Sequence, residues 1–221
     1  EIGGEAGVGK SRLLLEFRGR IPQGEFAYLE GRCIHFGGAM AYLPILDILR
    51  SYFEIKEGEQ EFLIKRKMKE RVRKFDEKLQ GILSPLQDLL SLKVEDEQYL
   101  KLEPKQKREK IFEAIRDLFI RESQNKPLVL VFEDLHWIDK SSEDHLKHLL
   151  ESIPGAKVLL ILTYRPEFVH TWGAKSYHSQ VMLNRLSNRE SLIMVSHLLG
   201  TEELDKDLEE FILEKTEGVP F

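Results

Sequence analysis

The feature that most constrains this chain is a glycine-rich stretch near its start, "GEAGVGKS", which runs from Gly4 to Ser11. Its spacing, a glycine, any four residues and then Gly-Lys-Ser, is that of a phosphate-binding loop. Glycines let the loop backbone turn its N–H groups toward phosphate oxygens. A helix expected over residues 10–20 would direct its N-terminal amides at the same anion. The stretch therefore predicts a nucleotide-binding loop between a strand and a helix, against the alternative of a chance glycine-rich loop or flexible tail.

Two side chains of this loop have specific tasks in such a site. Lys10 supplies a mobile positive charge for the β- and γ-phosphates, and the Ser11 hydroxyl is a hard oxygen ligand for Mg²⁺. The residues that we expect to contact the nucleotide here are Gly4, Glu5, Ala6, Gly7, Val8, Gly9, Lys10, Ser11 and Arg12.

Two apolar runs, "PLVLVF" at 127–132 and "KVLLILTY" at 157–164, predict strands that are buried on both faces. Each run is short, rich in Val, Leu and Ile, and shows no polar alternation, as in a parallel sheet. Residues 139–155 between them predict a helix, with Ser141 as its N-cap and Pro154-Gly155 at its end. A strand, a helix and a strand in this order imply a right-handed parallel crossover and hence an α/β fold.

The remaining elements follow from the same patterns. Strands are expected over 25–33 and 179–183, and helices over 44–53, 60–80 and 105–122 within a helical stretch from about 36 to 124. Beyond 184 the periodicity becomes helical: Ser187 and Glu190 form a capping box, Gly200 ends that helix, and a second helix covers 203–215. We therefore predict a core domain over 1–184 and the start of a small helical lid over 185–221.

Acidic residues follow the first apolar run directly, in the sequence Phe132-Glu133-Asp134. A nucleotide-hydrolysing site needs one carboxylate to hold Mg²⁺ through its water shell and another to orient or deprotonate the attacking water. Adjacent residues on a strand point to opposite faces, so Glu133 and Asp134 can serve one site only if the strand has ended. The alternative is a pair of solvated carboxylates at the start of a loop.

Arg165 follows the second apolar run in "TYRP" at 163–166. In an open parallel sheet, ligands bind beyond the carboxyl ends of the strands. Arg165 is therefore at the edge where it could contact a γ-phosphate, and the alternative is an exposed arginine in a loop.

Charge and composition exclude several classes of protein. The chain has 33 basic and 38 acidic residues, a net charge of −5, so no overall charge attracts it to nucleic acid or anionic lipid. Its single Cys33 excludes an internal disulfide framework and fits a reducing compartment. The longest apolar runs are far shorter than the ~20 residues of a membrane span. We expect a cytoplasmic protein without a membrane partner.

Three further patterns have plain interpretations. The basic stretch at 65–74, "KRKMKERVRK", suggests nucleic acid, but interleaved acids favour a solvated helix or a partner surface. His145 and His148 have metal-ligand spacing without a Cys or third His, so we predict a solvated helix face rather than a zinc site. The "NKPL" at 125–128 lacks the final Asp of a guanine-specific motif and precedes a strand, which argues against GTP.

The stretches "GEAGVGKSRLL", "FEDLHWIDKSS" and "LTYRPE", in this order, resemble the signal-transduction ATPases with numerous domains (STAND). More narrowly, they resemble the origin-recognition-complex-like AAA ATPase domains of large bacterial regulators. The resemblance extends over nearly the whole chain, including "GRC" at 31–33, "YLPILDILR" at 42–50 and "KTEGVPF" at 215–221.

The resemblance implies a P-loop NTPase fold with three α/β/α layers and a sheet order of 5-1-4-3-2. It makes Glu133 the acid on the Mg²⁺ side, Asp134 the water-activating residue, Arg165 a sensor and Pro220 a contact to adenine. Glu133 stands where the broader pattern has Asp, which leaves the division of roles between Glu133 and Asp134 open. Members of this family have a complete first strand and further helices, so we interpret the chain as an excerpt of a larger protein.

The function expected from the resemblance is ATP–Mg²⁺ binding and slow ATP hydrolysis, with Lys10, Glu133, Asp134 and Arg165 as the catalytic set. The nucleotide state would change the conformation of a larger signalling protein. Two alternatives are a module that holds ATP or ADP without turnover and a DNA-remodelling ATPase. Beyond ATP or ADP, the expected partners are other domains of the same parent protein and, through self-association, further copies; the charge pattern argues against nucleic acid.

Overall fold

The computed structural model describes residues 1–22, 24–35, 41–75, 77–173, 175–201 and 204–220. The chain divides into two compact units. One unit contains Ile21–Leu162, and the other contains Glu1–Arg20 together with Thr163–Phe221. The expected domain boundary at 184 stays a prediction.

Five strands form one sheet in the order β2-β3-β4-β1-β5, and every pair of neighbours is parallel. This is the order 5-1-4-3-2 counted from the other edge, so the expected α/β topology is confirmed. The strands are β1 (Ile2–Gly4), β2 (Ala27–Arg32), β3 (Leu128–Glu133), β4 (Val158–Tyr164) and β5 (Val181–Leu183).

In the unit of residues 21–162, β3 is buried along its whole length, as its run of Leu, Val and Phe predicts. Its residues pair in continuous register with β2, from Ala27 opposite Leu128 to Arg32 opposite Glu133. Helix α2 (Leu43–Tyr52) packs on β2, and α6 (Pro104–Asn125) packs on β3 and on α7 (Lys140–Ser152). The carboxyl ends of β2 and β3 are thereby held in a packed core.

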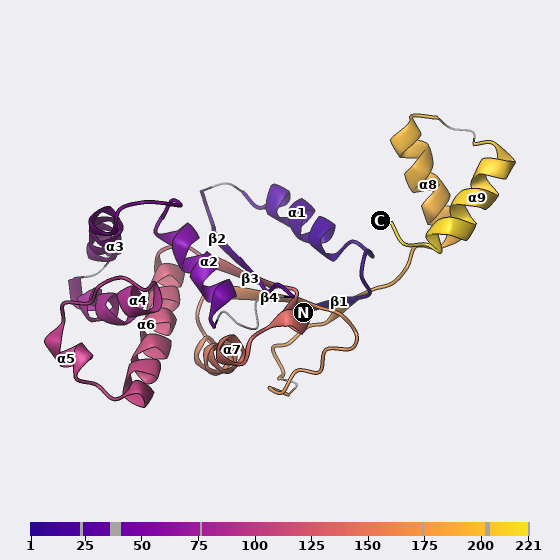
Figure 1. The fold of residues 1–221 in the computed structure, drawn as a ribbon. Helices are drawn as coiled ribbons and strands as arrows, with labels where there is room; N and C mark the ends of the chain where they lie inside the picture. The colour runs from indigo at the N-terminus through magenta and orange to yellow at the C-terminus, as the bar shows by residue number, and fades with distance from the viewer. Residues whose placement is uncertain (23, 36–40, 76, 174, 202–203, 221) are drawn as a thin grey trace. The chain divides into compact units, whose positions relative to one another are not determined.

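Further helices of this unit lie on the same side of it as α6 (Figure 1). They are α3 (Glu61–Phe75), the 3₁₀ helix η2 (Glu77–Ile82), α4 (Leu83–Leu89) and the short α5 (Glu97–Leu100). Of these, η2 and α4 pack on α6, and α3 packs on η2 and α4. The continuous helix expected over 60–80 is therefore wrong in its second part, because α3 ends at Phe75 and a 3₁₀ helix follows.

The start of α7 differs from the prediction by two residues. Its N-cap is Asp139, whose carboxylate accepts a hydrogen bond from the Ser142 N–H at 2.9 Å. Ser141, the expected cap, already lies within the helix. Aspartate and serine are both good caps, so residue type alone does not distinguish Asp139 from Ser141.

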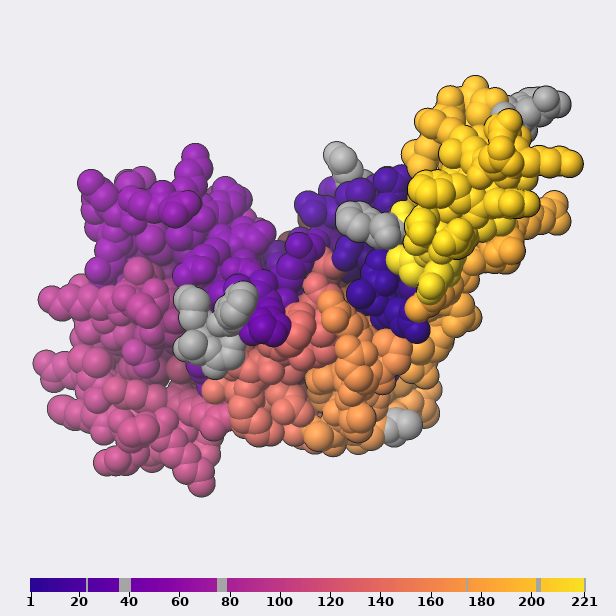
Figure 2. All heavy atoms as spheres, turned by 45° about the vertical axis from the view of Figure 1, so that its right-hand side comes forward, coloured from indigo at the N-terminus to yellow at the C-terminus, as the bar shows by residue number. Residues whose placement is uncertain are grey.

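The second unit contains α1 (Lys10–Arg20), α8 (Asn188–Leu199) and α9 (Lys206–Thr216). The capping box of Ser187 and Glu190 is confirmed, and Gly200 ends α8 with a left-handed φ of 67°. Helix α9 has no buried residue, and its atoms, yellow in Figure 2, lie at the surface. The expected start of that helix, Glu203, lies outside the described residues. Among the described helices, none is both long enough and apolar enough to cross a lipid bilayer.

Candidate functional site

The glycine-rich loop lies where the sequence predicts it, between β1 and the first residue of α1. Gly7 and Gly9 have φ angles of 78° and 104°, in the left-handed region that side chains with a Cβ rarely adopt. The loop backbone therefore depends on these glycines, and α1 begins directly after it at Lys10. A helix N-terminus that follows such a loop is a ready-made site for a phosphate group.

Lys10 lies inside this loop, with 8% of its surface exposed. Its Nζ donates hydrogen bonds to the carbonyl oxygens of Gly4 and Glu5, each at 2.7 Å. An ammonium group has three donors and no acceptor, so loop carbonyls are suitable partners for it. The positive charge is thus held at the centre of the loop.

Glu133 and Asp134 lie where a strand ends. β3 ends at Glu133, and Asp134 has a left-handed φ of 59° and caps the 3₁₀ helix η3 (Leu135–Trp137). Aspartate tolerates this backbone conformation better than most residues. Because the strand has ended at Asp134, the strict alternation of side chains no longer separates the two carboxylates.

Arg32 is a site residue that the sequence analysis missed. It ends β2 directly opposite Glu133, and its Nη2 lies 2.7 Å from the Glu133 Oε1. The Glu133 side chain is only 2% exposed, whereas that of Arg32 is 54% exposed. The pKa of Arg32 is raised, first by its hydrogen bond to Glu133 and then by the charge of that group. The "GRC" stretch was the available signal, since its arginine lies at the end of the strand next to β3.

Glu30 brings a second carboxyl group against Glu133. It lies two residues before Arg32 on β2 and therefore on the same face of the strand. The pKa of Glu30 is raised, first by burial and then by its hydrogen bond to Glu133. Cys33, which is buried, follows Arg32, and its N–H donates to the Glu133 carbonyl at 2.9 Å. We call Arg32, Glu133 and Asp134 the acid side.

Arg165 lies directly after β4 and belongs to the same compact unit as the glycine-rich loop. Its backbone carbonyl accepts a hydrogen bond from Phe168 at 2.9 Å, which starts a turn. The structure thus groups Arg165 with the loop in one unit, and Glu133 with Asp134 in the other.

An ion pair joins the start of the expected lid to the glycine-rich loop. Arg185 lies 2.9 Å from a carboxylate oxygen of Glu5 in the loop and 2.9 Å from one of Glu217 after α9. The next residue, Leu186, donates its N–H to the carbonyl of Gly218 at 2.7 Å. We call the loop from Gly4 to Ser11, with Arg185, the loop side. Pro220, the expected adenine contact, is half-buried, and Phe221 lies outside the described residues.

The solvated face predicted for the α7 histidines is wrong for His145. This side chain is completely buried and packs on the ring of Phe112, with 4.9 Å between the ring centroids. Burial lowers the pKa of His145 to about 3, with a smaller contribution from the charge of His148. His145 is therefore a neutral core residue at physiological pH.

The donor types on both sides suit magnesium. Mg²⁺ binds hard oxygen ligands and uses one or two protein groups together with substrate phosphates, rather than a cage of protein ligands. The Ser11 hydroxyl and the Glu133 carboxylate are such donors. In the part of the chain that the structure describes, no group of three or more His, Cys, Asp or Glu residues could hold a metal by itself.

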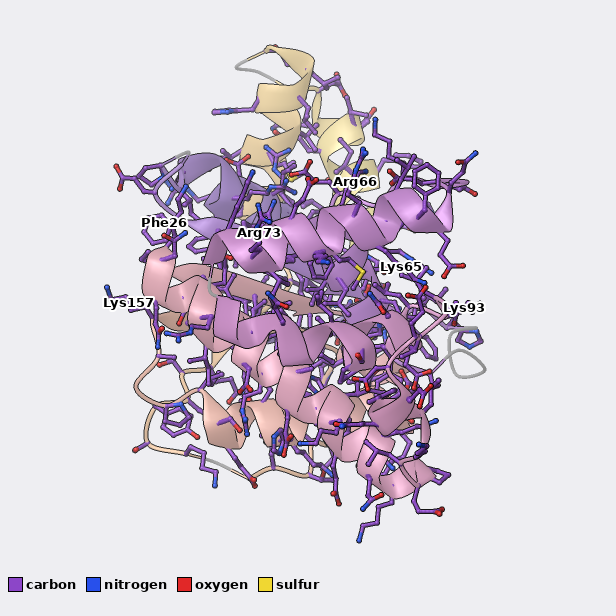
Figure 3. The ribbon with its side chains drawn as sticks, turned by 90° about the vertical axis from the view of Figure 1, so that its left-hand side faces the viewer. Phe26, Lys65, Arg66, Arg73, Lys93 and Lys157 are labelled. Carbon is purple, nitrogen blue, oxygen red and sulfur yellow. The ribbon has the colours of Figure 1, made fainter. Side chains whose placement is uncertain are left out.

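The basic stretch of α3 is interleaved with acids in space as well as in sequence. Lys65 pairs with Glu61 at 2.9 Å, and Lys67 pairs with Glu59 at 2.7 Å. Figure 3 shows Arg66 and Arg73 projecting from α3, where both are exposed. These contacts support the interpretation of α3 as a solvated helix rather than a uniformly basic nucleic-acid surface.

A parallel five-stranded sheet, a glycine-rich loop from β1 into α1 and a carboxylate pair at the end of β3 define a P-loop nucleotide-binding fold. Residues 2–161 match the family described as the AAA ATPase domain. Because the match covers most of the chain, the chain belongs to this family.

Two individual proteins are similar to the chain. An uncharacterized protein of Rhizobium meliloti (strain 1021) is 27% identical over 196 residues, which are 88% of this chain and 19% of that protein. The chain thus spans about a fifth of the length of this relative. A STAND protein with a tetratricopeptide repeat sensor from Pyrococcus horikoshii matches 99% of this chain and 25% of its own, at 15% identity and a TM-score of 0.46.

Proposed function

We propose that this domain binds ATP with Mg²⁺ and hydrolyses it slowly, as a nucleotide-dependent switch in a larger signalling protein. The observation that carries the proposal is the loop: two glycines in left-handed conformations, a buried lysine at its centre and a helix that begins directly after it. This combination is the phosphate-binding device of P-loop proteins. Membership of the AAA ATPase domain family supports ATP as the nucleotide.

Each side of the site has its own task in this proposal. The loop amides and the N-terminus of α1 bind the phosphates, and Lys10 exchanges its two carbonyl partners for the β- and γ-phosphate oxygens. Ser11 and Glu133 would hold the metal. When bound, Mg²⁺ neutralises negative charge that develops on the phosphate oxygens. Asp134 orients or deprotonates the attacking water, Arg165 contacts the γ-phosphate, and Pro220 packs on the adenine.

The switch itself would use the contact between Arg185 and Glu5. Glu5 belongs to the loop that surrounds the phosphates, so a change of nucleotide alters the surroundings of its carboxylate. Arg185 passes this change to Glu217 at the end of α9, because one guanidinium group bridges both carboxylates. Other domains of the same protein, or a second copy of it, would receive the resulting movement of the lid.

The direct test is the removal of the loop lysine. We expect Lys10→Ala to lower the affinity for a fluorescent ATP analogue by about tenfold or more, because two or more charge-assisted hydrogen bonds are lost. Phosphate release from ATP should fall to the background rate. The matched control is Lys206→Ala, which removes an exposed lysine at the start of α9. Equal affinity and equal phosphate release in the wild type and Lys10→Ala would contradict the proposal.

A second candidate is a module that holds ATP or ADP without turnover. The observation in its favour is that Glu133 is already neutralised by Arg32. Asp134→Asn separates the two candidates, because it removes the water-activating charge and keeps the shape of the side chain. A hydrolase loses phosphate release and retains analogue binding in this variant. A holding module shows the same background release in the wild type and in Asp134→Asn.

A further inference from the structure

A cavity of about 450 Å³ opens at the amino ends of β2 and β3, in the unit of residues 21–162. Its wall includes Phe26 and Ala27, where β2 begins, and Asn125 and Lys126, where α6 ends. The acid side lies at the opposite, carboxyl ends of the same two strands. The cavity is therefore separate from the acid side, and its volume suits a small molecule.

Glu122 of α6 brings a buried carboxylate to the wall of this cavity. It is 4% exposed, and its Oε2 accepts a hydrogen bond from the Tyr52 hydroxyl at 2.9 Å. Among the residues that the structure describes, no lysine, arginine or histidine forms an ion pair with it. Burial of a carboxylate without a paired cation is costly. A cationic group that enters the cavity would supply the missing partner.

Arg71 of α3 also lines the cavity, but its charge is used elsewhere. Its guanidinium carbon lies 4.5 Å from the centroid of the Tyr52 ring, and its Nη1 lies 3.2 Å from a carboxylate oxygen of Glu54. Its Nε is buried and makes no hydrogen bond within the described part of the chain. One N–H donor of Arg71 therefore remains for an acceptor on a ligand.

Two further cations of the wall have no acidic partner. They are Lys74 of α3 and Lys126 at the end of α6, and both are exposed. Neither ammonium group forms an ion pair with a residue in the described ranges. Phe26, which is labelled in Figure 3, is 37% exposed and gives the same wall an apolar surface. The cavity thus presents a buried negative charge, two positive charges and an aromatic ring.

We propose that this cavity binds a small zwitterion with an apolar side chain, either an α-amino acid or a short peptide. The ammonium group of the ligand pairs with Glu122, its carboxylate with Lys74 and Lys126, and its side chain packs on Phe26. A simple anion would leave Glu122 unpaired, and a simple cation would leave both lysines unpaired, whereas a zwitterion satisfies the two sets. The proposal is independent of the proposed function, because no residue of the nucleotide site takes part in it.

The first measurement is isothermal titration of the full chain with L-phenylalanine and with the dipeptide Phe-Gly. N-acetyl-L-phenylalanine and L-phenylalaninamide are the matched probes, since each lacks one of the two charges. We expect each of them to bind about tenfold or more weakly than L-phenylalanine, because one charged group of the cavity stays unpaired. Tighter binding of Phe-Gly identifies a peptide as the ligand, and tighter binding of L-phenylalanine identifies a free amino acid.

The second measurement repeats the titration with variants of the wall. We expect Glu122→Gln to weaken zwitterion binding by about tenfold or more, because it removes the buried charge and keeps the shape of the side chain. Its control is Glu109→Gln, at an exposed glutamate earlier on the same helix. The double variant Lys74→Ala, Lys126→Ala should bind about threefold or more weakly, since its two charges are exposed. Its control is Lys105→Ala, at an exposed lysine near the start of α6.

The outcomes separate this inference from the proposed function. Dissociation constants weaker than about 10 mM for both zwitterions overturn the inference, whatever the affinity for ATP. Equal affinities of L-phenylalanine and its N-acetyl derivative, or of the wild type and Glu122→Gln for the zwitterions, also overturn it. If Glu122→Gln does not fold, the two charge-blocked probes still decide the question on the wild type. Loss of ATP binding in Lys10→Ala with unchanged zwitterion binding supports two independent sites.

Discussion

The acid side and the loop side each contain an arginine that bridges to glutamate, and the two bridges differ in burial. On the acid side, Arg32 meets a carboxylate that is 2% exposed, on a neighbouring strand in continuous register. On the loop side, Arg185 is 45% exposed, and both of its glutamate partners are exposed as well. The same pair of residue types therefore has different physical consequences in the two places.

The burial of each bridge determines how easily its arginine and glutamate separate. Breaking a buried pair leaves an uncompensated charge in the core, so the acid side opens only at a high cost in free energy. An exposed pair contributes little to stability and can separate into water. We infer that the loop side is suited to movement with the nucleotide, and that the acid side is suited to holding a fixed charge.

The largest effect is expected where the fixed backbone of the acid side is disturbed. Gly31→Ala places a Cβ atom 2.0 Å from the Pro44 carbonyl oxygen, and the backbone of β2 or α2 must move. We expect a loss of about 3 kcal/mol in the free energy of unfolding, measured by chemical denaturation. The matched control is Gly19→Ala in α1, where a Cβ atom would meet no neighbour, and a gain of roughly 0.5–1 kcal/mol is expected. Equal stability of the two variants would show that the close approach of Gly31 to Pro44 does not fix the backbone of the acid side.

An intermediate effect is expected when the pH is lowered, through His145, the histidine buried in α7. The ordinary pKa of histidine is 6.5, and that of folded His145 is about 3. Between these values the unfolded chain binds a proton that the folded protein does not, so stability falls as the pH falls from 6.5 toward 3. At pH 5 this loss amounts to about 2 kcal/mol.

His145→Leu should remove this part of the acid sensitivity. Its free energy of unfolding, measured by denaturant titration from pH 8 to pH 5, should decline by about 2 kcal/mol less than that of the wild type. His197→Ala, which replaces an exposed histidine on α8, serves as the control and should follow the wild type. Parallel curves for all three proteins would show that His145 takes up a proton without unfolding.

The smallest effect on stability is expected on the loop side. Arg185→Ala removes an exposed group, so we expect no resolvable change in the denaturation midpoint. The variant should instead weaken the link between the loop and the end of α9. We expect it to abolish the difference between the ATP-bound and ADP-bound protein in hydrogen exchange over α8 and α9, with both nucleotides still bound. A retained difference would mean that the lid senses the nucleotide without Arg185.

Patterns that are local in the sequence predicted much of this molecule. The runs at 127–132 and 157–164 became β3 and β4, and β3 is buried along its whole length as expected. The burial expected for both faces of the second run is wrong for the first half of β4, where Leu159 is 50% exposed. The helix over 10–20 was predicted to the residue, since the glycine-rich loop fixes where it begins. The order of the sheet came from the family resemblance, not from the patterns themselves.

The features that the sequence did not indicate are contacts between residues that lie far apart in the chain. Arg32 and Glu133 are 101 residues apart, and only the pairing of β2 with β3 brings them together. The burial of His145 likewise depends on Phe112 of α6, which faces it across the helix packing. Residues 60–80 contain no proline or glycine that would mark the end of α3 at Phe75, and the first glycine, Gly81, already lies in the 3₁₀ helix. The roles of the residues from Gly4 to Arg12, and those of Glu133, Asp134, Arg165 and Pro220, stay predictions.

The buried residue next to Arg32 gives the acid side a reporter of its own. Cys33 is the single cysteine of the chain and is 2% exposed, and burial raises the pKa of its thiol above the ordinary value. A thiol that is both covered and protonated reacts slowly with alkylating reagents, which attack the thiolate. Its alkylation therefore requires the end of β2 to open, and the rate of labelling measures how often the carboxyl ends of β2 and β3 part.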